Sequence, residues 1–401
     1  MLCNRTALAL LGTLLMCSGL VACGSGQGTS SSSSPSAKNS QVIAVNGGPN
    51  DNYANGLFTT VTVCAPGTSN CQSIPGVLVD TGSFGLRLLA SAVGGLGASL
   101  PQQNGSNGNL VFECAQFVDS VLWGPVKSAD VVLANETAKS VPIELIDASS
   151  VPVPSGCKAI GPAEENVASL GANGILGIGF FVADCGNACT SAPVTNPGFY
   201  YSCIASSCTV AAEPLSQQVQ NPVASFAQDN NGVVIELPAA AASGPTLSGS
   251  LVLGIGTEGD NGIGSEELFA PDRFGNMLTT FKGHQYPGFL DTGSNGYFFL
   301  DSKTTGIADC STSQKGFYCP ASPVNLSAVN NSAQGSSSTV NFTIVSASQL
   351  FSNSNDFVFP TLGGSNPGIF DWGLPFFLGR NVFVAIEGRN TPAGAGPFWA
   401  Y

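Results

Sequence analysis

The stretch Val77-Leu78-Val79-Asp80-Thr81-Gly82-Ser83 has a counterpart in Gly288-Phe289-Leu290-Asp291-Thr292-Gly293-Ser294. In both stretches an apolar run leads into the tetrapeptide Asp-Thr-Gly-Ser. The two aspartates are separated by about 210 residues, the length of one ordinary domain. We therefore predict an internal duplication in which each copy contributes one aspartate to a shared site.

Each position of the tetrapeptide has a predicted role in that site. The glycine permits the sharp turn that presents the aspartate, and it brings a backbone N–H close to the carboxylate. The threonine hydroxyl can bond across a two-fold interface, and the serine hydroxyl can donate to the outer carboxylate oxygen. Two carboxylates held in this way share one proton and can activate water. The residues predicted to support Asp80 and Asp291 are Thr81, Gly82, Ser83, Thr292, Gly293 and Ser294.

The composition favours a β-rich, acid-tolerant protein. Only 9% of the residues are charged, the net charge is −13, and 12 residues are basic. Few helix-building charged residues are present, which favours strands and loops. Phosphate contacts need clustered Lys and Arg, so the composition argues against nucleic-acid binding. We predict no cofactor and no metal.

The N-terminus has the pattern of an export signal. Arg5 precedes a short apolar stretch at residues 7–15, which is too short to span a membrane. The sequence Leu20-Val21-Ala22-Cys23 resembles the lipobox of bacterial lipoproteins, which implies that Cys23 is acylated and that Gly24 directs the protein to the outer membrane. We predict a signal peptide over residues 1–22 and a Ser-rich tether over residues 23–41. The only membrane contact expected is through the lipid.

Cysteine counting agrees with export to an oxidising compartment. Ten cysteines remain after the signal and the lipidated residue are set aside, and they can form up to five disulfides. Spacing suggests that Cys64 pairs with Cys71 and Cys310 with Cys319, which leaves Cys114 for Cys157. The quartet Cys185, Cys189, Cys203 and Cys208 can pair nested or side by side. Its spacing also approximates a zinc site, although no histidine lies nearby.

Short apolar runs between turn residues predict an all-β fold with two barrel-like lobes. The predicted lobes are residues 42–220, with a disulfide-held insertion at 183–210, and residues 221–401. Hairpins are expected to end at each aspartate, and a further strand at 357–360. The Ser- and Asn-rich stretch 311–338 predicts a long surface loop. His284, the only histidine, is expected in a solvated turn.

The two aspartate stretches resemble the catalytic loops of the pepsin-like aspartic peptidases. Four further segments resemble that family in order and spacing: residues 173–179 and 372–378 resemble its strand–Gly motifs, and residues 221–223 and 248–254 the entry to its second lobe. The resemblance covers residues 42–401. It implies a bilobed fold with a cleft between the lobes and a catalytic dyad of Asp80 and Asp291.

The chain departs from the family where a flap tyrosine and its tryptophan partner are expected. No tyrosine occurs between Tyr53 and Tyr200, and Phe117 or Trp123 takes the flap position. Arg87 stands where the resemblance places the tryptophan. A cation there would lower the pKa values of the dyad carboxyls.

The sequence therefore supports a monomeric, envelope-anchored aspartic endopeptidase acting on a peptide or protein. A rival hypothesis keeps the fold without catalysis, as a protein that binds a peptide, protein or glycan in the cleft. A structural lipoprotein of the cell surface rests only on the tether and the disulfides.

Overall fold

The computed structural model describes residues 38–191, 196–311 and 314–401. Within these residues strands far outnumber helices, as the composition predicts. The predicted signal peptide, most of the predicted tether and the predicted lipidation site Cys23 lie outside the described residues. No helix among the described residues is both long and apolar enough to span a membrane.

Six strands of the N-terminal half close into a barrel. They are β2 (Gly56–Cys64), β3 (Cys71–Asp80), β4 (Phe84–Leu89), β6 (Val121–Leu133), β7 (Glu136–Ile146) and β8 (Gly174–Ile178). They follow one another in the order β2, β3, β8, β4, β7 and β6, and the pairing of β6 with β2 closes the ring. The edge beyond β6 is extended by β5 (Leu110–Gln116), β9 (Tyr200–Ile204) and β10 (Ser207–Val210).

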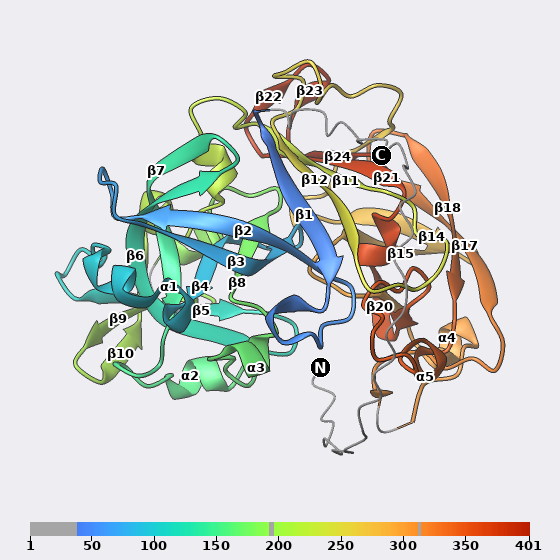
Figure 1. Ribbon diagram of the computed structural model, residues 1–401, viewed down its shortest axis with the longest axis horizontal. Coiled ribbons are helices and arrows are strands. Elements are labelled where there is room, and N and C mark those ends of the chain that lie inside the picture. The colour runs from blue at the N-terminus through green and yellow to red at the C-terminus, as the bar shows by residue number, and fades with distance from the viewer. Residues whose placement is uncertain (1–37, 192–195, 312–313) are drawn as a thin grey trace, which may run out of the picture.

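A second run of strands continues from β2 across the middle of the molecule. In order it contains β1 (Ser40–Asn46), β12 (Leu247–Leu253), β11 (Gly232–Leu237), β21 (Arg380–Ala385), β24 (Phe398–Ala400) and β13 (Leu268–Phe269). Figure 1 shows β1, β11 and β12 between the blue-green N-terminal half and the orange-red C-terminal half. Strand β1 begins at Ser40, which pairs with Val252, so the first strand starts two residues before the predicted start of the N-terminal lobe at residue 42.

The C-terminal half has its own seven-stranded sheet. Its order is β18 (Ser337–Ile344), β17 (Val324–Asn331), β14 (Met277–Phe281), β15 (His284–Leu290), β20 (Asn366–Trp372), β16 (Tyr297–Leu300) and β19 (Gly363–Gly364). A small hairpin, β22 (Asn390–Thr391) with β23 (Gly394–Ala395), completes the strands.

Helices are short and lie in the connections. The α-helices are α1 (Ala90–Val93), α2 (Ser155–Lys158), α3 (Val167–Leu170), α4 (Ser302–Thr305) and α5 (Ala347–Leu350). The 3₁₀ turns are η1 (Gly48–Asn50), η2 (Gly94–Ser99), η3 (Gly186–Cys189), η4 (Leu215–Gln217), η5 (Pro222–Ser225) and η7 (Leu374–Phe376).

Two secondary-structure predictions are wrong, one of a loop and one of a strand. The predicted loop 311–338 contains β17 and the start of β18. In β17 the polar residues Asn325 and Ser327 are exposed, whereas Asn330 is buried. The predicted strand at 357–360 is an irregular segment in which only Val358 forms an isolated bridge, with Gly244. Its neighbour Pro360 has no amide N–H to donate, which disfavours a ladder there.

Candidate active site

Each predicted aspartate lies where a strand of the duplicated pattern ends. Asp80 is the last residue of β3, and Asp291 directly follows β15. Strand β3 pairs in parallel with β8, which pairs antiparallel with β4. Strand β15 has the same relation to β20 and β16. The same local arrangement of strands therefore presents both aspartates.

The two loops are joined by reciprocal hydrogen bonds between their threonines. The Thr81 amide donates to Thr292 Oγ1 (3.1 Å), and the Thr292 amide donates to Thr81 Oγ1 (3.0 Å). Each hydroxyl then donates to the opposite strand, Thr81 to the Leu290 carbonyl (3.1 Å) and Thr292 to the Val79 carbonyl (2.7 Å). Both threonines are buried. The four bonds hold the aspartates together although 211 residues separate the threonines.

Glycine and serine support the carboxylates as the pattern predicts. The Gly82 amide donates to Asp80 Oδ1 (2.8 Å), and Ser83 Oγ donates to Asp80 Oδ2 (2.5 Å). In the second loop the Gly293 amide donates to Asp291 Oδ1 (2.7 Å), and Ser294 Oγ lies 2.8 Å from Asp291 Oδ2.

The two carboxyl groups lie close enough to share a proton. A Cβ placed on Gly82 would lie 2.6 Å from Asp291 Cγ, and one on Gly293 would lie 2.7 Å from Asp80 Cγ, so each loop needs glycine at this point. Burial, the charge of Asp291 and a hydrogen bond with the Asp291 side chain raise the pKa of the Asp80 carboxyl well above its ordinary value. The two carboxyls therefore form one coupled pair.

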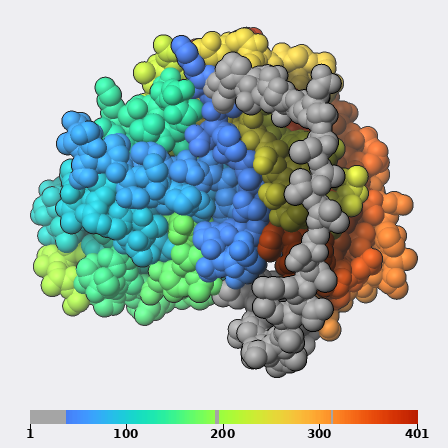
Figure 2. All heavy atoms as spheres, in the orientation of Figure 1, coloured from blue at the N-terminus to red at the C-terminus, as the bar shows by residue number. Residues whose placement is uncertain are grey.

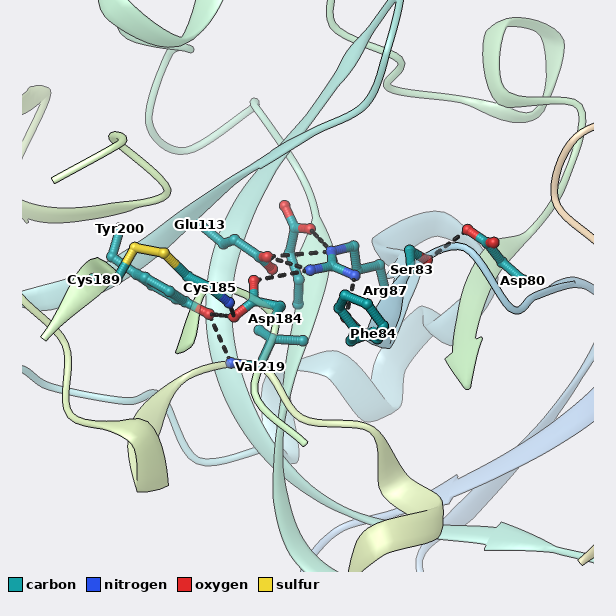
Figure 3. A network of polar contacts seen from close by, with 11 residues as sticks. Asp80, Ser83, Phe84, Arg87, Glu113, Asp184, Cys185, Cys189, Tyr200 and Val219 are labelled. Carbon is teal, nitrogen blue, oxygen red and sulfur yellow. Dashed lines mark hydrogen bonds and ion pairs between the residues drawn. A yellow bond between two sulfur atoms is a disulfide. The ribbon is translucent and has the colours of Figure 1, made fainter. Parts of the chain in front are cut away.

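Arg87 is not a cleft residue, and its predicted effect on the dyad is wrong. The side chain is buried, and Figure 3 shows it directed toward Glu113 and Asp184. Arg87 Nη2 donates to Glu113 Oε1 (2.5 Å) and to Asp184 Oδ2 (3.0 Å), and Nε lies 3.5 Å from Glu144 Oε2. Three carboxyls other than the aspartate pair surround the Arg87 charge, and the pKa of Asp80 is raised instead of lowered.

The Arg87 cluster reaches the first loop through the backbone. Arg87 Nη1 donates to the carbonyl of Phe84 (2.8 Å), the residue after Ser83. On its far side, Tyr200 Oη donates to Asp184 Oδ1 (2.5 Å) and accepts from the Val219 amide (2.8 Å), as Figure 3 shows.

One guanidinium among three buried carboxyls leaves excess negative charge, so protons are retained. Burial raises the pKa of Glu113 to about 7 and that of Glu144 to about 8, although the charge of Arg87 opposes both shifts. Burial and the charge of Glu113 raise the pKa of Asp184 well above its ordinary value.

The two aromatic residues predicted for the flap occupy different environments. Trp123 is fully buried, stacks on Phe112 and donates its indole N–H to the Val151 carbonyl (2.8 Å). Phe117 is partly buried in the turn between β5 and β6, and packs against the cluster that contains Leu78. Trp123 is therefore a core residue, and Phe117 alone lies at the hairpin turn.

A segment that the sequence did not single out, residues 47–55, lies beside the two loops. Asn55 Nδ2 donates to the carbonyls of Asn295 (2.8 Å) and Phe359 (2.9 Å), which links this N-terminal segment to the C-terminal half. Burial, followed by the charges of Asp80, Glu164 and Asp291, raises the pKa of the Tyr53 phenol. Figure 2 shows blue N-terminal atoms at the surface between the two halves.

A third carboxyl near the dyad was also missed. Asp371, the penultimate residue of β20, is buried, and its Oδ2 lies 2.6 Å from Ser294 Oγ. An acidic residue in the otherwise apolar run Ile369-Phe370-Asp371-Trp372 was the available signal. His284 is exposed at the start of β15 and takes no part in this arrangement.

The described disulfides confirm the three predicted pairs and decide the quartet. Bonds join Cys64 to Cys71, Cys114 to Cys157 and Cys310 to Cys319. The quartet pairs side by side, Cys185 with Cys189 and Cys203 with Cys208. The zinc alternative is wrong because all four sulfurs are consumed in disulfides.

The fold and site define a mostly β protein with two joined Asp-Thr-Gly-Ser loops. The chain belongs to a family described as a protein of unknown function (DUF3443), whose model matches residues 35–401. A search of curated proteins found no match.

Proposed function

We propose that this protein is an aspartic endopeptidase with a bilobed, pepsin-like fold. The observation that carries the proposal is the reciprocal Thr81–Thr292 bonding, which holds two similarly supported carboxyls together at one buried point. The repeated relation of β3, β8 and β4 to β15, β20 and β16 supports an origin by duplication. In Figure 1 the two sets of strands lie on either side of β1, β11 and β12.

In the proposed reaction the dyad begins with one proton. Asp291 is the ionised base and Asp80 the protonated acid, in keeping with the raised pKa of Asp80. Asp291 takes a proton from water, whose oxygen bonds to the scissile carbonyl carbon while Asp80 donates its proton to the carbonyl oxygen. The resulting gem-diol then loses its C–N bond. The amine nitrogen receives the proton held by Asp291, and one gem-diol hydroxyl returns a proton to Asp80.

The proposed setting is the bacterial envelope, with the chain anchored through Cys23 and acting as a monomer on a peptide or protein. Five disulfides among the described residues support an oxidising compartment. The lipobox-like sequence before Cys23 supports the anchor.

The test is cleavage of a fluorogenic peptide library from acidic to neutral pH. Asp80→Asn and Asp291→Asn should each lower kcat/KM by about 10³-fold, because each removes one of the two proton-transfer groups. Asp309→Asn, at an exposed aspartate, is the matched control and should cleave like the wild type. A statine-type inhibitor should block the wild type. Turnover that survives in either dyad variant would refute the proposal.

A second function, binding without cleavage, is favoured by the segment 47–55. The Asn55 side chain donates to the carbonyls of Asn295 and Phe359, which ties the two halves together beside the second aspartate loop. This alternative predicts no turnover in the wild type and peptide binding that is equal in the wild type and in Asp80→Asn. Calorimetric titration with library-selected peptides distinguishes the two functions.

A further inference from the structure

Asp371 breaks the symmetry between the two halves at the level of a single residue. In the N-terminal half, Val79 pairs with Leu176, so the preceding residue of β8 is Ile175. In the C-terminal half, Leu290 pairs with Trp372, so the equivalent residue of β20 is Asp371. Ile175 belongs to an apolar cluster. Where the N-terminal half has a buried hydrocarbon side chain, the C-terminal half therefore has a buried carboxyl group.

The Ser294 hydroxyl lies between the carboxyl groups of Asp371 and Asp291. Ser294 Oγ lies 2.6 Å from Asp371 Oδ2 and 2.8 Å from Asp291 Oδ2. A serine hydroxyl has one hydrogen, and an ionised carboxylate can only accept. Two ionised carboxylates would therefore compete for one hydrogen. Both short contacts are satisfied when one carboxyl is protonated and donates to Ser294 Oγ, while the hydroxyl donates to the other.

The surroundings decide which carboxyl holds the proton. Asp291 Oδ1 accepts the Gly293 amide at 2.7 Å, which favours the ionised form. Asp371 Oδ1 is buried and has no hydrogen-bond partner among the described residues. A neutral carboxyl tolerates that isolation far better than a charged one. The chain of donors thus runs from Asp371 through Ser294 to Asp291.

In the part of the chain that is described, no cation forms an ion pair with Asp371 or Asp291, because every ion pair found there involves Arg87. The charged groups that act on Asp371 are Asp291 and Asp80, and burial followed by the charge of Asp291 raises the pKa of Asp371 well above its ordinary value. The paired residues on its neighbouring strands, Phe289 and Phe298, are uncharged. Other titratable residues on these strands are His284 and Tyr286 of β15 and Tyr297 of β16.

We propose that Asp371 is a third carboxyl of the site, a positioning residue that holds a proton and orients the Ser294 hydroxyl toward ionised Asp291. The proposal rests on the proposed peptidase function for its effect on turnover. The working state then holds two protons on three carboxyls. When Asp371 releases its proton to solvent at higher pH, its charge opposes that of Asp291 and both compete for the Ser294 hydrogen.

Two substitutions separate this role from packing. In Asp371→Asn the amide N–H donates to Ser294 Oγ at every pH and cannot ionise, so the alkaline limb of kcat/KM should move up by about one pH unit. In Asp371→Leu the donor is lost, so Asp291 is less well stabilised. We expect kcat to fall roughly tenfold and the acid limb to move upward. Asparagine should restore most of the turnover that leucine loses. Ile175→Val is the matched control in the other half and should leave the profile unchanged.

A second readout does not need activity. The infrared carbonyl band of a protonated carboxyl should be present at neutral pH in the wild type and weaker in Asp371→Asn. The wild type and the Asp371→Asn variant are compared as folded, disulfide-bonded proteins. If Asp371→Asn fails to fold, the band in the wild type is compared with Ser294→Ala, which removes the hydroxyl partner and should shift its frequency.

The outcomes separate the inference from the function. Cleavage by the wild type together with an unchanged pH profile and an unchanged band in Asp371→Asn would overturn the role of Asp371 and leave the peptidase standing. If the wild type does not cleave but the carboxyl band is weaker in Asp371→Asn, the peptidase is refuted and the protonated Asp371 is supported.

Discussion

The two aspartate loops have nearly identical internal geometry, and the regions behind them differ in charge. The first loop is backed by Arg87 and three buried carboxyls, connected through the Phe84 carbonyl. The second is backed by Asp371 alone, in a sheet dominated by aromatic contacts such as that of Phe370 with Trp372. The comparison indicates that the two halves share the threonine–glycine frame and differ in the charged groups that lie behind it.

The largest expected effect comes from removing the cation of the first region. Arg87→Met leaves Glu113, Glu144 and Asp184 buried without a counter-charge and should lower the free energy of unfolding by about 3–5 kcal/mol. The loss should be smaller at acidic pH, where these carboxyls are protonated. Chemical denaturation with intact disulfides, at pH 5 and pH 7.5, measures both values.

Arg380→Met is the matched control in the C-terminal half. The Arg380 guanidinium lies over the Phe376 ring, 4.5 Å from its centroid, and no ion pair to it is found in the described residues. Its loss should cost about 1 kcal/mol. Equal costs for the two arginines would contradict the idea that the first region depends on its buried charge.

The second prediction concerns pH. The pKa values of Glu113 and Glu144 in the folded protein are about 7 and about 8, above the ordinary value near 4.3 in an unfolded chain. The folded state therefore binds more protons than the unfolded state in this interval. Stability is fully present below about pH 4 and is lost as the pH rises through 7 to 8, by about 1.4 kcal/mol per pH unit for each such proton. We expect the two groups together to lose on the order of 5 kcal/mol of stability between pH 5 and pH 7.

Glu144→Gln tests the source of this slope. The amide is neutral and of nearly the same shape, so the variant should show a flatter dependence of unfolding free energy on pH. Asp309→Asn, at an exposed position, should keep the wild-type slope. A slope that survives Glu144→Gln unchanged would locate the pH dependence outside the first region.

Features encoded within a few adjacent residues were predictable from the sequence. The Asp-Thr-Gly-Ser loops, the hairpins that precede them and the disulfide between Cys310 and Cys319 are of this kind. The quartet was undecided because its pairing depends on register. Cys203 lies directly opposite Cys208 in the β9–β10 ladder, and no local pattern states that register.

Features made by distant residues were not predictable from one sequence. Arg87 contacts Glu113 and Asp184, which lie 26 and 97 residues away in the sequence. No local sequence pattern therefore indicated that these two residues, or Glu144, would surround the arginine. The strand β17 was missed because its exposed face carries Asn and Ser, which also mark loops. Asp371 could have been found, since a carboxyl in an apolar strand that ends at the site requires a partner.

The smallest expected effect tests the frame that both halves share. Thr81→Val leaves the Thr292 amide and the Leu290 carbonyl without their partner, and Thr292→Val does the same to the Thr81 amide and the Val79 carbonyl. Each change leaves two buried backbone groups without a hydrogen-bond partner and should lower the free energy of unfolding by about 2 kcal/mol. The two variants should lose the same amount within about 0.5 kcal/mol. Thermal and urea unfolding of the paired variants measures this equality, with Thr343→Val as an exposed-strand control. A difference above about 1 kcal/mol would show that the frame itself, and not only the charge behind it, has diverged between the halves.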